Sequence, residues 1–350
     1  RPSDMSGEII FSMYAPDSPV KVFSKEEWFS DSWDPMDHGR EIDWSRPFLE
    51  QLYELMLEIP FKATNVINGV GSPYSNNATD PKNCFLVFNA TNPEDSMYSN
   101  GMNFCKDCVD TSHVSKSESC YQSFWLTSCY RTHYSSECTD SSDLWFCRDC
   151  QGSMNCFGSV NLRNKSYCFF NKQCTKEEYK EKLAEYKLHT REGVERALAE
   201  TREFWKKFPH KFEQGIKNEN CSGSYVTTSK NVHDSYLVRE SENLRYCQSI
   251  QESPGAKDCY DYSIWGDGAE MVYEAVSSGT GVQNIKFAFL TQENVHNMEY
   301  TILCSNGSSD LFGCVGLRKK QYCILNKQYS KEEYEELIEK IKKHMTDMPY

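Results

Sequence analysis

Two short cysteine pairs are the residues of this chain with the clearest chemical potential. The stretch CKDC runs from Cys105 to Cys108, and CRDC runs from Cys147 to Cys150. A Cys-x-x-Cys spacing suits tetrahedral zinc, and two such pairs together would supply four thiolate ligands. The pairs therefore raise a zinc-site hypothesis, which holds only if the fold brings them together.

A repeat of three residues offers a second explanation for the same spacing. At every third position from Cys84 to Leu162 there is no charged or aromatic residue and no Asn, Gln or Gly, and all nine cysteines of the stretch share this frame. An α-helix repeats every 3.6 residues and a flat strand every two, so neither explains the pattern. The spacing of both cysteine pairs is then the period of a repeat.

A longer period accompanies the short one. Ser117, Ser135 and Ser153 lie 18 residues apart, and neighbouring Cys and Leu positions recur at the same interval. We predict a mainly β protein in which a β-solenoid has about 18 residues per coil, with Cys, Ser and Leu triplets facing inward. Polyproline-II segments also repeat every three residues, but they need Gly or Pro at crowded positions, which this stretch almost lacks.

The pattern occurs in two modules. The frame resumes from Ser229 to Cys259, with Ser253 among its positions, and continues through Gly266 after a slip of one residue. Such a slip is typical of a bulge or a corner insertion. The module ending CFGSVNLRNKSYCFFNKQCTKEEY (156–179) matches LFGCVGLRKKQYCILNKQYSKEEY (311–334), which indicates an internal duplication.

Each module ending runs into a predicted helix. Thr175 with Glu178, and Ser330 with Glu333, fit the S/T-x-x-E capping box. Because a solenoid end exposes unpaired backbone groups, we expect these helices to cover the ends of the modules.

The remaining segments are predicted to form an α/β N-terminal segment and a helical linker between the modules. At the N-terminus we expect a hairpin around Pro16–Pro19 and a helix capped by Ser45 that ends before Pro60, and residues 191–207 are expected to form a linking helix. The predicted organisation is an N-terminal hairpin and helix (1–62), a first β-solenoid module (63–174), a helical cap and linker (175–216), a second module (217–329) and a C-terminal capping helix (330–350).

Two stretches carry a family resemblance, namely GEIIFSMYAPDSPVKVFSKEEWFSDSWDPMDHG (7–39) and FGCVGLRKKQYCILNKQYSKEEYEELIEKI (312–341). They resemble uncharacterised Cys-rich repeat proteins of candidate-phyla bacteria and large DNA viruses, some of which carry a CoA-transferase label. Members of that family often begin with a zinc-ribbon-like segment, whose last Cys corresponds to Ser3 here. The resemblance implies the repeat architecture and no particular activity.

The cysteines could also fill space or form disulfides. In an 18-residue coil the two Cys-x-x-Cys pairs would lie about 11 Å apart, too far to share one zinc ion. Cys129 and Cys147 would stack at a distance that permits a disulfide. We favour buried reduced thiols, because buried Cys acts as a small hydrophobe. The 17 cysteines then fit a cytoplasmic or virion location, with an extracellular one as the alternative.

Catalytic signatures are weak. The chain lacks Gly-x-Ser-x-Gly, a Walker loop and a dinucleotide fingerprint. Two polar groups could act as acid–base or metal sites: His38 with Asp34, Asp37 and Asp43, and the carboxylates Asp140, Asp143 and Asp149. Charged residues between inward positions more often form a solvated face. The sequence favours a non-enzymatic protein without a cofactor.

Outward-facing rings are the best candidate interaction surface. The candidates are Tyr121, Phe124, Trp125, Trp145, Phe146 and Phe157. They could bind a protein or, through Trp125 and Trp145, a sugar; the alternative is that a helix or the other module covers them.

The sequence favours a structural or scaffold protein. It would contact protein partners or its own copies, for example as a component of a larger particle or envelope. The alternatives are a carbohydrate-binding or polysaccharide-active solenoid and a zinc-binding protein. A net charge of −13 works against nucleic-acid partners, and the chain has no apolar run of 18 residues that could span a membrane.

Overall fold

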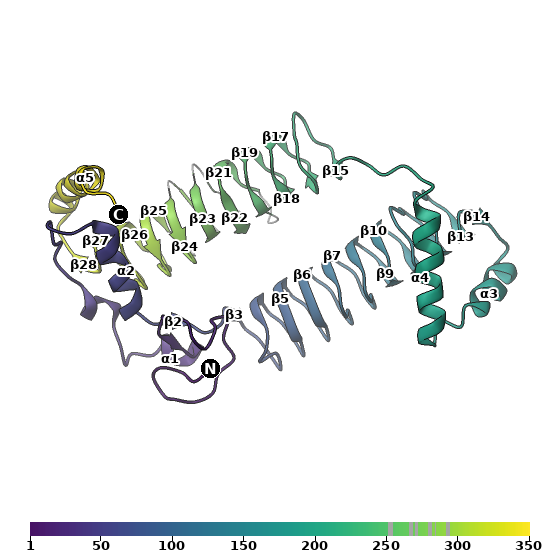
Figure 1. The fold of residues 1–350 in the computed structure, drawn as a ribbon, viewed down its shortest axis with the longest axis horizontal. Coiled ribbons are helices and arrows are strands. Elements are labelled where there is room, and N and C mark those ends of the chain that lie inside the picture. The colour runs from purple at the N-terminus through teal and green to yellow at the C-terminus, as the bar shows by residue number, and fades with distance from the viewer. Residues whose placement is uncertain (251–254, 266–268, 270–271, 279–281, 284, 292–294) are drawn as a thin grey trace. The chain divides into compact units, whose positions relative to one another are not determined.

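The computed structural model describes residues 1–250, 255–265, 269, 272–278, 282–283, 285–291 and 295–350. The described chain is mainly β, with five α-helices, and its coils of parallel strands form β-solenoids (Figure 1). It divides into two compact units, one of residues 1–10, 14–62 and 211–350 and one of residues 11–13 and 63–210. The predicted inward residues Ser253 and Gly266 lie outside the described residues.

The first coil stack (residues 63–173) has two described sheets. Their orders are β10-β8-β7-β6-β5-β4-β3 and β14-β13-β12-β11-β9. All pairings are parallel except that of β14 with β13. The strands are β3 (Val66–Ile67), β4 (Asn76–Thr79), β5 (Phe85–Thr91), β6 (Met97–Asn103), β7 (Ser112–Ser115), β8 (Phe124–Thr127), β9 (Tyr130–His133), β10 (Ser136–Thr139), β11 (Ser142–Trp145), β12 (Met154–Phe157), β13 (Ser166–Phe169) and β14 (Lys172–Gln173).

The predicted inward frame is confirmed, because every third residue from Cys84 to Leu162 is buried. The predicted coil length is wrong. Ser112 pairs with Phe124 and Leu144 with Cys156, and the Cys147 N–H bonds the hydroxyl of Ser135, in each case 12 positions apart. A coil therefore has four sides of three residues rather than six.

The 18-residue ladders arose because 18 is one and a half coils. Ser117 and Ser135 lie on different sides of the stack, and the neighbours of Ser117 are Cys105 and Cys129. Any multiple of three preserves the inward frame, and small residues at all four sides make unrelated positions look alike. The composition therefore predicts the frame but not the number of corners.

Each corner is a residue in the left-handed backbone region. From Asn77 to Phe170 every third residue has a positive φ, including bulky ones such as Tyr98 (53°) and Trp125 (55°). For a residue with a Cβ this conformation costs roughly 1–2 kcal/mol. Asn and Asp tolerate it best, and Asn83 also donates to Asp95 of the next coil at 3.1 Å.

Backbone hydrogen bonds run from every coil to both of its neighbours. A strand residue donates to the following coil, as Phe85 does to the Ser96 carbonyl at 3.1 Å. A corner residue donates to the preceding coil, as Asp95 does to the Lys82 carbonyl at 2.9 Å. These two sets of bonds occupy two of the three N–H groups of each side and leave the inward residue's N–H to be satisfied differently.

Where an inward serine lies one coil earlier, its hydroxyl satisfies that third N–H. The Cys147 N–H donates to the Oγ of Ser135 one coil earlier at 2.9 Å, and this hydroxyl donates to the His133 carbonyl at 2.8 Å. The same arrangement joins the Cys247 N–H to Ser235 in the second coil stack at 3.1 Å. Inward Ser therefore completes backbone hydrogen bonding that would otherwise be lost in the interior.

The second coil stack (residues 215–328) is built the same way with less regular coils. Leu311 pairs with Cys323 across 12 residues, whereas Asn297 bonds Asp310 across 13 and Asn243 bonds Asp258 across 15. A 13-residue coil shifts the frame of three by one residue, as the predicted slips require, whereas the 15-residue coil lengthens one coil and keeps the frame.

Its described strands form sheets in the orders β15-β16-β18-β20-β22-β23-β24-β25-β26-β27-β28 and β17-β19-β21. They are β15 (Gly215–Ile216), β16 (Val226–Thr227), β17 (Lys230–His233), β18 (Tyr236–Arg239), β19 (Glu242–Arg245), β20 (Gln248–Ile250), β21 (Lys257–Tyr260), β22 (Tyr262–Trp265), β23 (Tyr273–Ser278), β24 (Lys286–Phe289), β25 (His296–Ile302), β26 (Ser309–Phe312), β27 (Gln321–Ile324) and β28 (Lys327–Gln328).

Both stacks end with an asparagine whose side chain is hydrogen-bonded to the preceding coil. Asn171 and Asn326 each use the side-chain amide to bond the N–H and the carbonyl of one residue in the preceding coil, Val160 and Val315 respectively. An antiparallel strand, β14 or β28, then folds back and leads into a helix. This shared ending explains the matching sequences of the two modules.

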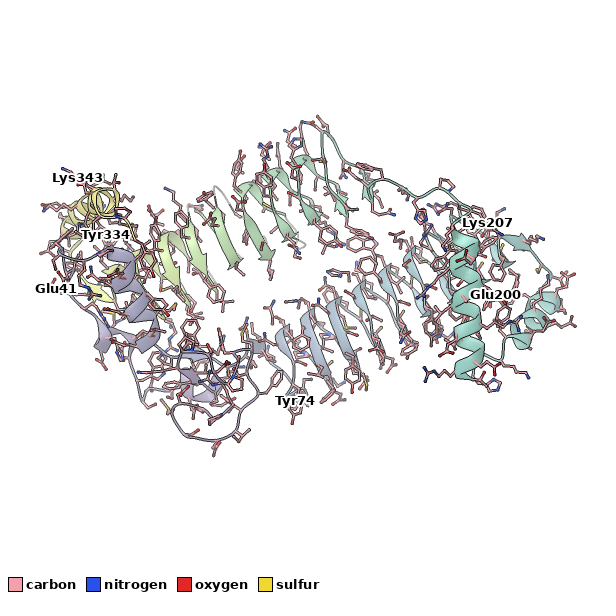
Figure 2. All side chains as sticks on the ribbon, viewed as in Figure 1. Glu41, Tyr74, Glu200, Lys207, Tyr334 and Lys343 are labelled. Atoms are coloured by element: carbon pink, nitrogen blue, oxygen red, sulfur yellow. The ribbon has the colours of Figure 1, made fainter. Side chains whose placement is uncertain are left out.

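The predicted capping helices are present. Helix α3 (Lys176–Glu185) and helix α5 (Lys331–Asp347) both begin with complete capping boxes. Together with α3, α4 (Arg191–Trp205) packs on rings at the end of the first stack. The α4 residue Glu200 accepts bonds from Tyr186 and Arg196 (Figure 2).

The N-terminal segment packs on the end of the second stack. Helix α2 (Phe48–Glu58) and α5 share an apolar core with β26 and β27. Glu41 (Figure 2) pairs with Lys327. A short helix α1 (Lys25–Trp28) and a 3₁₀ turn, Pro35–His38, complete the segment.

Two N-terminal predictions are wrong. β1 (Val22–Phe23) pairs in parallel with β2 (Phe61–Lys62), so no hairpin forms around Pro16–Pro19. Ser45 does not cap α2; its hydroxyl donates to Asp43, and the helix starts after Pro47, whose fixed φ suits that place.

We predict that Ser135→Ala lowers the free energy of unfolding by about 1–3 kcal/mol, because the buried Cys147 N–H loses its acceptor. Chemical denaturation followed by circular dichroism measures the change.

Ser142→Ala is the matched control, since Ser142 is a half-buried strand residue of β11 rather than an inward one. We expect this variant to unfold within about 0.5 kcal/mol of the parent. Equal effects of the two substitutions would contradict the role assigned to inward serines.

Candidate functional site

The two Cys-x-x-Cys pairs lie inside the first coil stack. Cys105 and Cys108 are consecutive inward residues, as are Cys147 and Cys150, and all four are buried. The 42 residues between the pairs amount to three and a half coils, so the pairs lie in different coils and on opposite sides of the interior. Within the described residues, no group of three or more His, Cys, Asp or Glu is arranged to hold a metal ion. The zinc interpretation stays a prediction from spacing alone.

The thiols donate to backbone carbonyls. Cys129 contacts the carbonyls of Thr127 and Cys138, each at 3.4 Å from Sγ. All 17 cysteines carry free thiols. Cys129 stacks on Ser117 and Ser141, so the Cys129–Cys147 disulfide considered from the sequence joins residues of different sides.

Stacked thiols also resist disulfide formation. Cys138 and Cys150 lie on successive coils with parallel side chains, so their Cβ atoms are separated by the strand spacing of about 4.8 Å. A disulfide needs Cβ atoms about 3.5–4.5 Å apart. Burial raises the pKa of the Cys138 thiol well above its ordinary value, which keeps it protonated.

Two of the six predicted surface rings are core residues. Phe146 and Phe157 are fully buried beneath α3 and α4, where Phe157 contacts Tyr186 with ring centroids 4.6 Å apart. The sequence placed both on the outer side of the coil correctly, but the helices that cover them come later in the chain. These two residues therefore serve packing rather than an exposed surface.

The other four rings are half-buried and lie on several sides of the stack. Trp145 packs on His133 with centroids 4.2 Å apart, and Tyr121 lies one coil before His133. Trp125 is a corner residue next to the ring of Phe124. The six candidates therefore do not form one continuous face.

The acidic candidates are also separated. Asp143 pairs with Arg131 at 2.6 Å and Asp149 with Arg163 at 2.7 Å, on different corners of the coils, while Asp140 occupies a third corner.

Near the N-terminus, Asp34 caps a 3₁₀ turn, Asp43 accepts from Ser45, and His38 faces Glu58 at 3.4 Å. Asp37 lies in that turn. These contacts give the N-terminal group structural roles rather than one shared acid–base centre.

A groove on the first coil stack escaped the sequence reasoning. Its volume is about 760 Å³, and of the predicted surface residues only Phe124 lines it. The lining is Leu86, Phe88, Tyr98, Ser99, Asn100, Asp110, Thr111, Ser112, Gln122, Ser123 and Phe124. A coil of 12 residues brings these residues together, whereas the predicted coil of 18 residues would place them on different sides. This groove is the candidate binding site of the stack.

Comparisons with known proteins do not identify a family. No protein-family model and no curated protein matches this chain. A solved structure designated a putative acetyltransferase, from Desulfovibrio desulfuricans G20, aligns with 77% of this chain and 69% of its own at 9% identity, with a TM-score of 0.14. So low a score supports no argument about function.

In the described part of the chain no helix has the length and apolar character to cross a membrane.

We predict one fast-reacting thiol in the native protein. Cys221 is half-buried and the other sixteen cysteines are buried. Because a thiolate is the reactive form, burial that raises the pKa of Cys129 to about 11 slows its reaction further. A thiol reagent at pH 8 should modify one group quickly and all 17 after denaturation.

Cys221→Ser should remove the fast phase, and Cys174→Ser, at a buried position, should keep it. Fewer than 17 reactive groups in denaturant would reveal disulfides and refute the reduced interior.

We also predict that stability falls above pH 8.5. Burial raises the pKa of Cys129 and Cys247 to about 11, against about 8.5 in an unfolded chain. Between these values the unfolded state binds fewer protons, so each such thiol lowers the free energy of unfolding by about 1.4 kcal/mol per pH unit.

Denaturation midpoints measured from pH 7 to 10 test this loss. Cys129→Ser places at this position the residue type found one coil earlier, at Ser117, and one coil later, at Ser141. The variant should lose less of its free energy of unfolding as the pH rises. An unchanged slope would show that buried thiols do not set the alkaline limit.

Proposed function

We propose that this protein is a non-enzymatic scaffold that associates with copies of itself through the open first coil of its second stack. The single observation that carries the proposal is the exposed sheet edge at β15. β15, labelled in Figure 1, is the terminal strand of its described sheet. The side chain of Ile216 in this strand is 63% exposed. Phe212, just before it, is 97% exposed.

The two ends of the second stack differ. Its last coil is covered by α2 and α5, which bury Phe312 and Ile324 completely. Its first coil presents backbone groups along β15, and such an edge pairs with another extended strand. Association is therefore directed to one end of the stack.

A second copy of the same coil fits this edge. Two copies related by a two-fold axis would pair β15 with β15 in antiparallel fashion and bring Ile216 and Phe212 of both together. The flanking charges alternate in sign, with Glu213 before the strand, then Lys217 and Glu219 after it, so an antiparallel copy places unlike charges in reach. This self-complementarity favours a copy over an unrelated partner.

We predict that the protein dimerises in a concentration-dependent way and that Ile216→Lys weakens dimerisation at least tenfold. The substitution places a buried charge at the paired edge, the device with which natural edge strands avoid association. Sedimentation at several protein concentrations measures the dissociation constant.

Ile9→Lys is the matched control, since Ile9 is also an exposed isoleucine of the same unit, 82% exposed, and pairs only in a short bridge with Pro2. It should dimerise like the parent. A parent protein that stays monomeric at every concentration, or an Ile216→Lys variant that dimerises normally, would refute the proposal.

A further inference from the structure

The groove on the first coil stack follows the direction in which the coils are stacked. Its walls come from four successive coils, which contribute Leu86 and Phe88, Tyr98 and Asn100, Asp110 and Ser112, and Gln122 and Phe124. Phe88, Asn100, Ser112 and Phe124 are direct register partners on β5, β6, β7 and β8. A long ligand in the groove would therefore meet a new pair of side chains about every 4.8 Å.

The walls are held in place by the coil-to-coil hydrogen bonds. Asn100 donates its N–H to the Thr111 carbonyl at 3.0 Å, and Ser112 donates to the Ser123 carbonyl at 3.1 Å. On the other wall, the Asp110 N–H donates to the Met97 carbonyl at 3.2 Å. Such a surface is pre-organised, so binding a ligand costs little conformational entropy of the protein.

The lining combines rings with neutral hydrogen-bonding groups. Phe88, Tyr98 and Phe124 supply aromatic faces, and Tyr98 is 51% exposed. Asn100 and Gln122 offer amides, while Asp110 is the carboxylate. None of the described residues that line the groove is Lys or Arg. An anionic ligand would find a carboxylate and no cation, so the charge favours a neutral one.

The position of the groove argues against a peptide strand. It lies on the side of the stack, where the backbone N–H groups of the strands already bond the neighbouring coils. A peptide could not extend a sheet there, because that mode needs an unpaired edge. Recognition has to come from side chains, namely ring faces and polar tips.

We propose that this groove binds a neutral, linear polysaccharide chain laid along the coil axis. The apolar faces of its sugar rings stack on Tyr98, Phe88 and Phe124, and its hydroxyls bond the amides of Asn100 and Gln122 and the carboxylate of Asp110. This binding activity is separate from self-association at β15 and goes beyond the scaffold role.

The groove binds without cleaving. Hydrolysis of a glycosidic bond ordinarily needs two carboxyl groups, about 5–9.5 Å apart, and Asp110 is the single carboxylate in the described lining. The ligand is therefore held intact. Of the two tryptophans considered from the sequence, neither Trp125 nor Trp145 lines the site.

Isothermal titration of the full chain with soluble oligomers of β-linked glucose and of β-linked N-acetylglucosamine tests the proposal. We expect at least one series to bind, with affinity rising with oligomer length, and Tyr98→Ala to weaken it roughly tenfold through loss of stacking. Tyr98→Phe keeps the ring and should retain most of the affinity.

Tyr246→Ala is the matched control, because Tyr246 is a corner residue of the second coil stack. Its φ is 57°, against 53° for Tyr98, and both side chains are 51% exposed. It should bind like the parent. Circular dichroism and denaturation midpoints confirm that the variants are folded.

The proposal is overturned if neither series binds, if Tyr98→Ala binds like the parent, or if a polyanionic glycan such as heparin binds more tightly. Ile216→Lys should bind the sugar oligomers normally. Titration thus tests sugar binding in the groove, and sedimentation tests self-association, so either proposal can fail without the other.

Discussion

The architecture depends on one recurring hydrogen bond, in which a buried hydroxyl accepts the N–H of the inward residue one coil later. In a side of three residues, the corner and strand N–H groups bond the neighbouring coils, and at positions such as Cys147 the inward N–H bonds a side-chain hydroxyl instead. Ser135 satisfies Cys147 in this way and Ser235 satisfies Cys247. The interior therefore needs side chains that are small and able to hydrogen-bond, which explains why Ser and Cys dominate it.

The same constraint explains the corners and the ends. Turning the chain every three residues requires a left-handed residue each time, and the hydrogen bonds between coils offset that strain. At the end of each stack, the side-chain amide of Asn171 or Asn326 bonds both the N–H and the carbonyl of a residue in the preceding coil. Helices then cover the aromatic rings of the last coils. The two stacks therefore end in the same structural arrangement.

The geometry divides the functional surface into ends and sides. At the β15 end of the second stack, Ile216 is exposed on a terminal strand, and the contact that we propose there is strand pairing. On a side, the backbone is already paired, and the binding that we propose in the groove around Tyr98 would use rows of side chains from successive coils. A β-solenoid with these two surfaces is consistent with a structural or scaffold role.

Much of this could be predicted from the sequence. The inward frame, the capping boxes at Thr175 and Ser330 and the β-solenoid itself follow from local rules, because backbone conformation and capping depend on residues within a few positions of one another. Coil length does not, since 12 and 18 residues both preserve a frame of three, and only the pairing of distant strands chooses between them. The burial of Phe146 under later helices and the assembly of the groove are likewise decided by contacts between coils and caps, which no local pattern records.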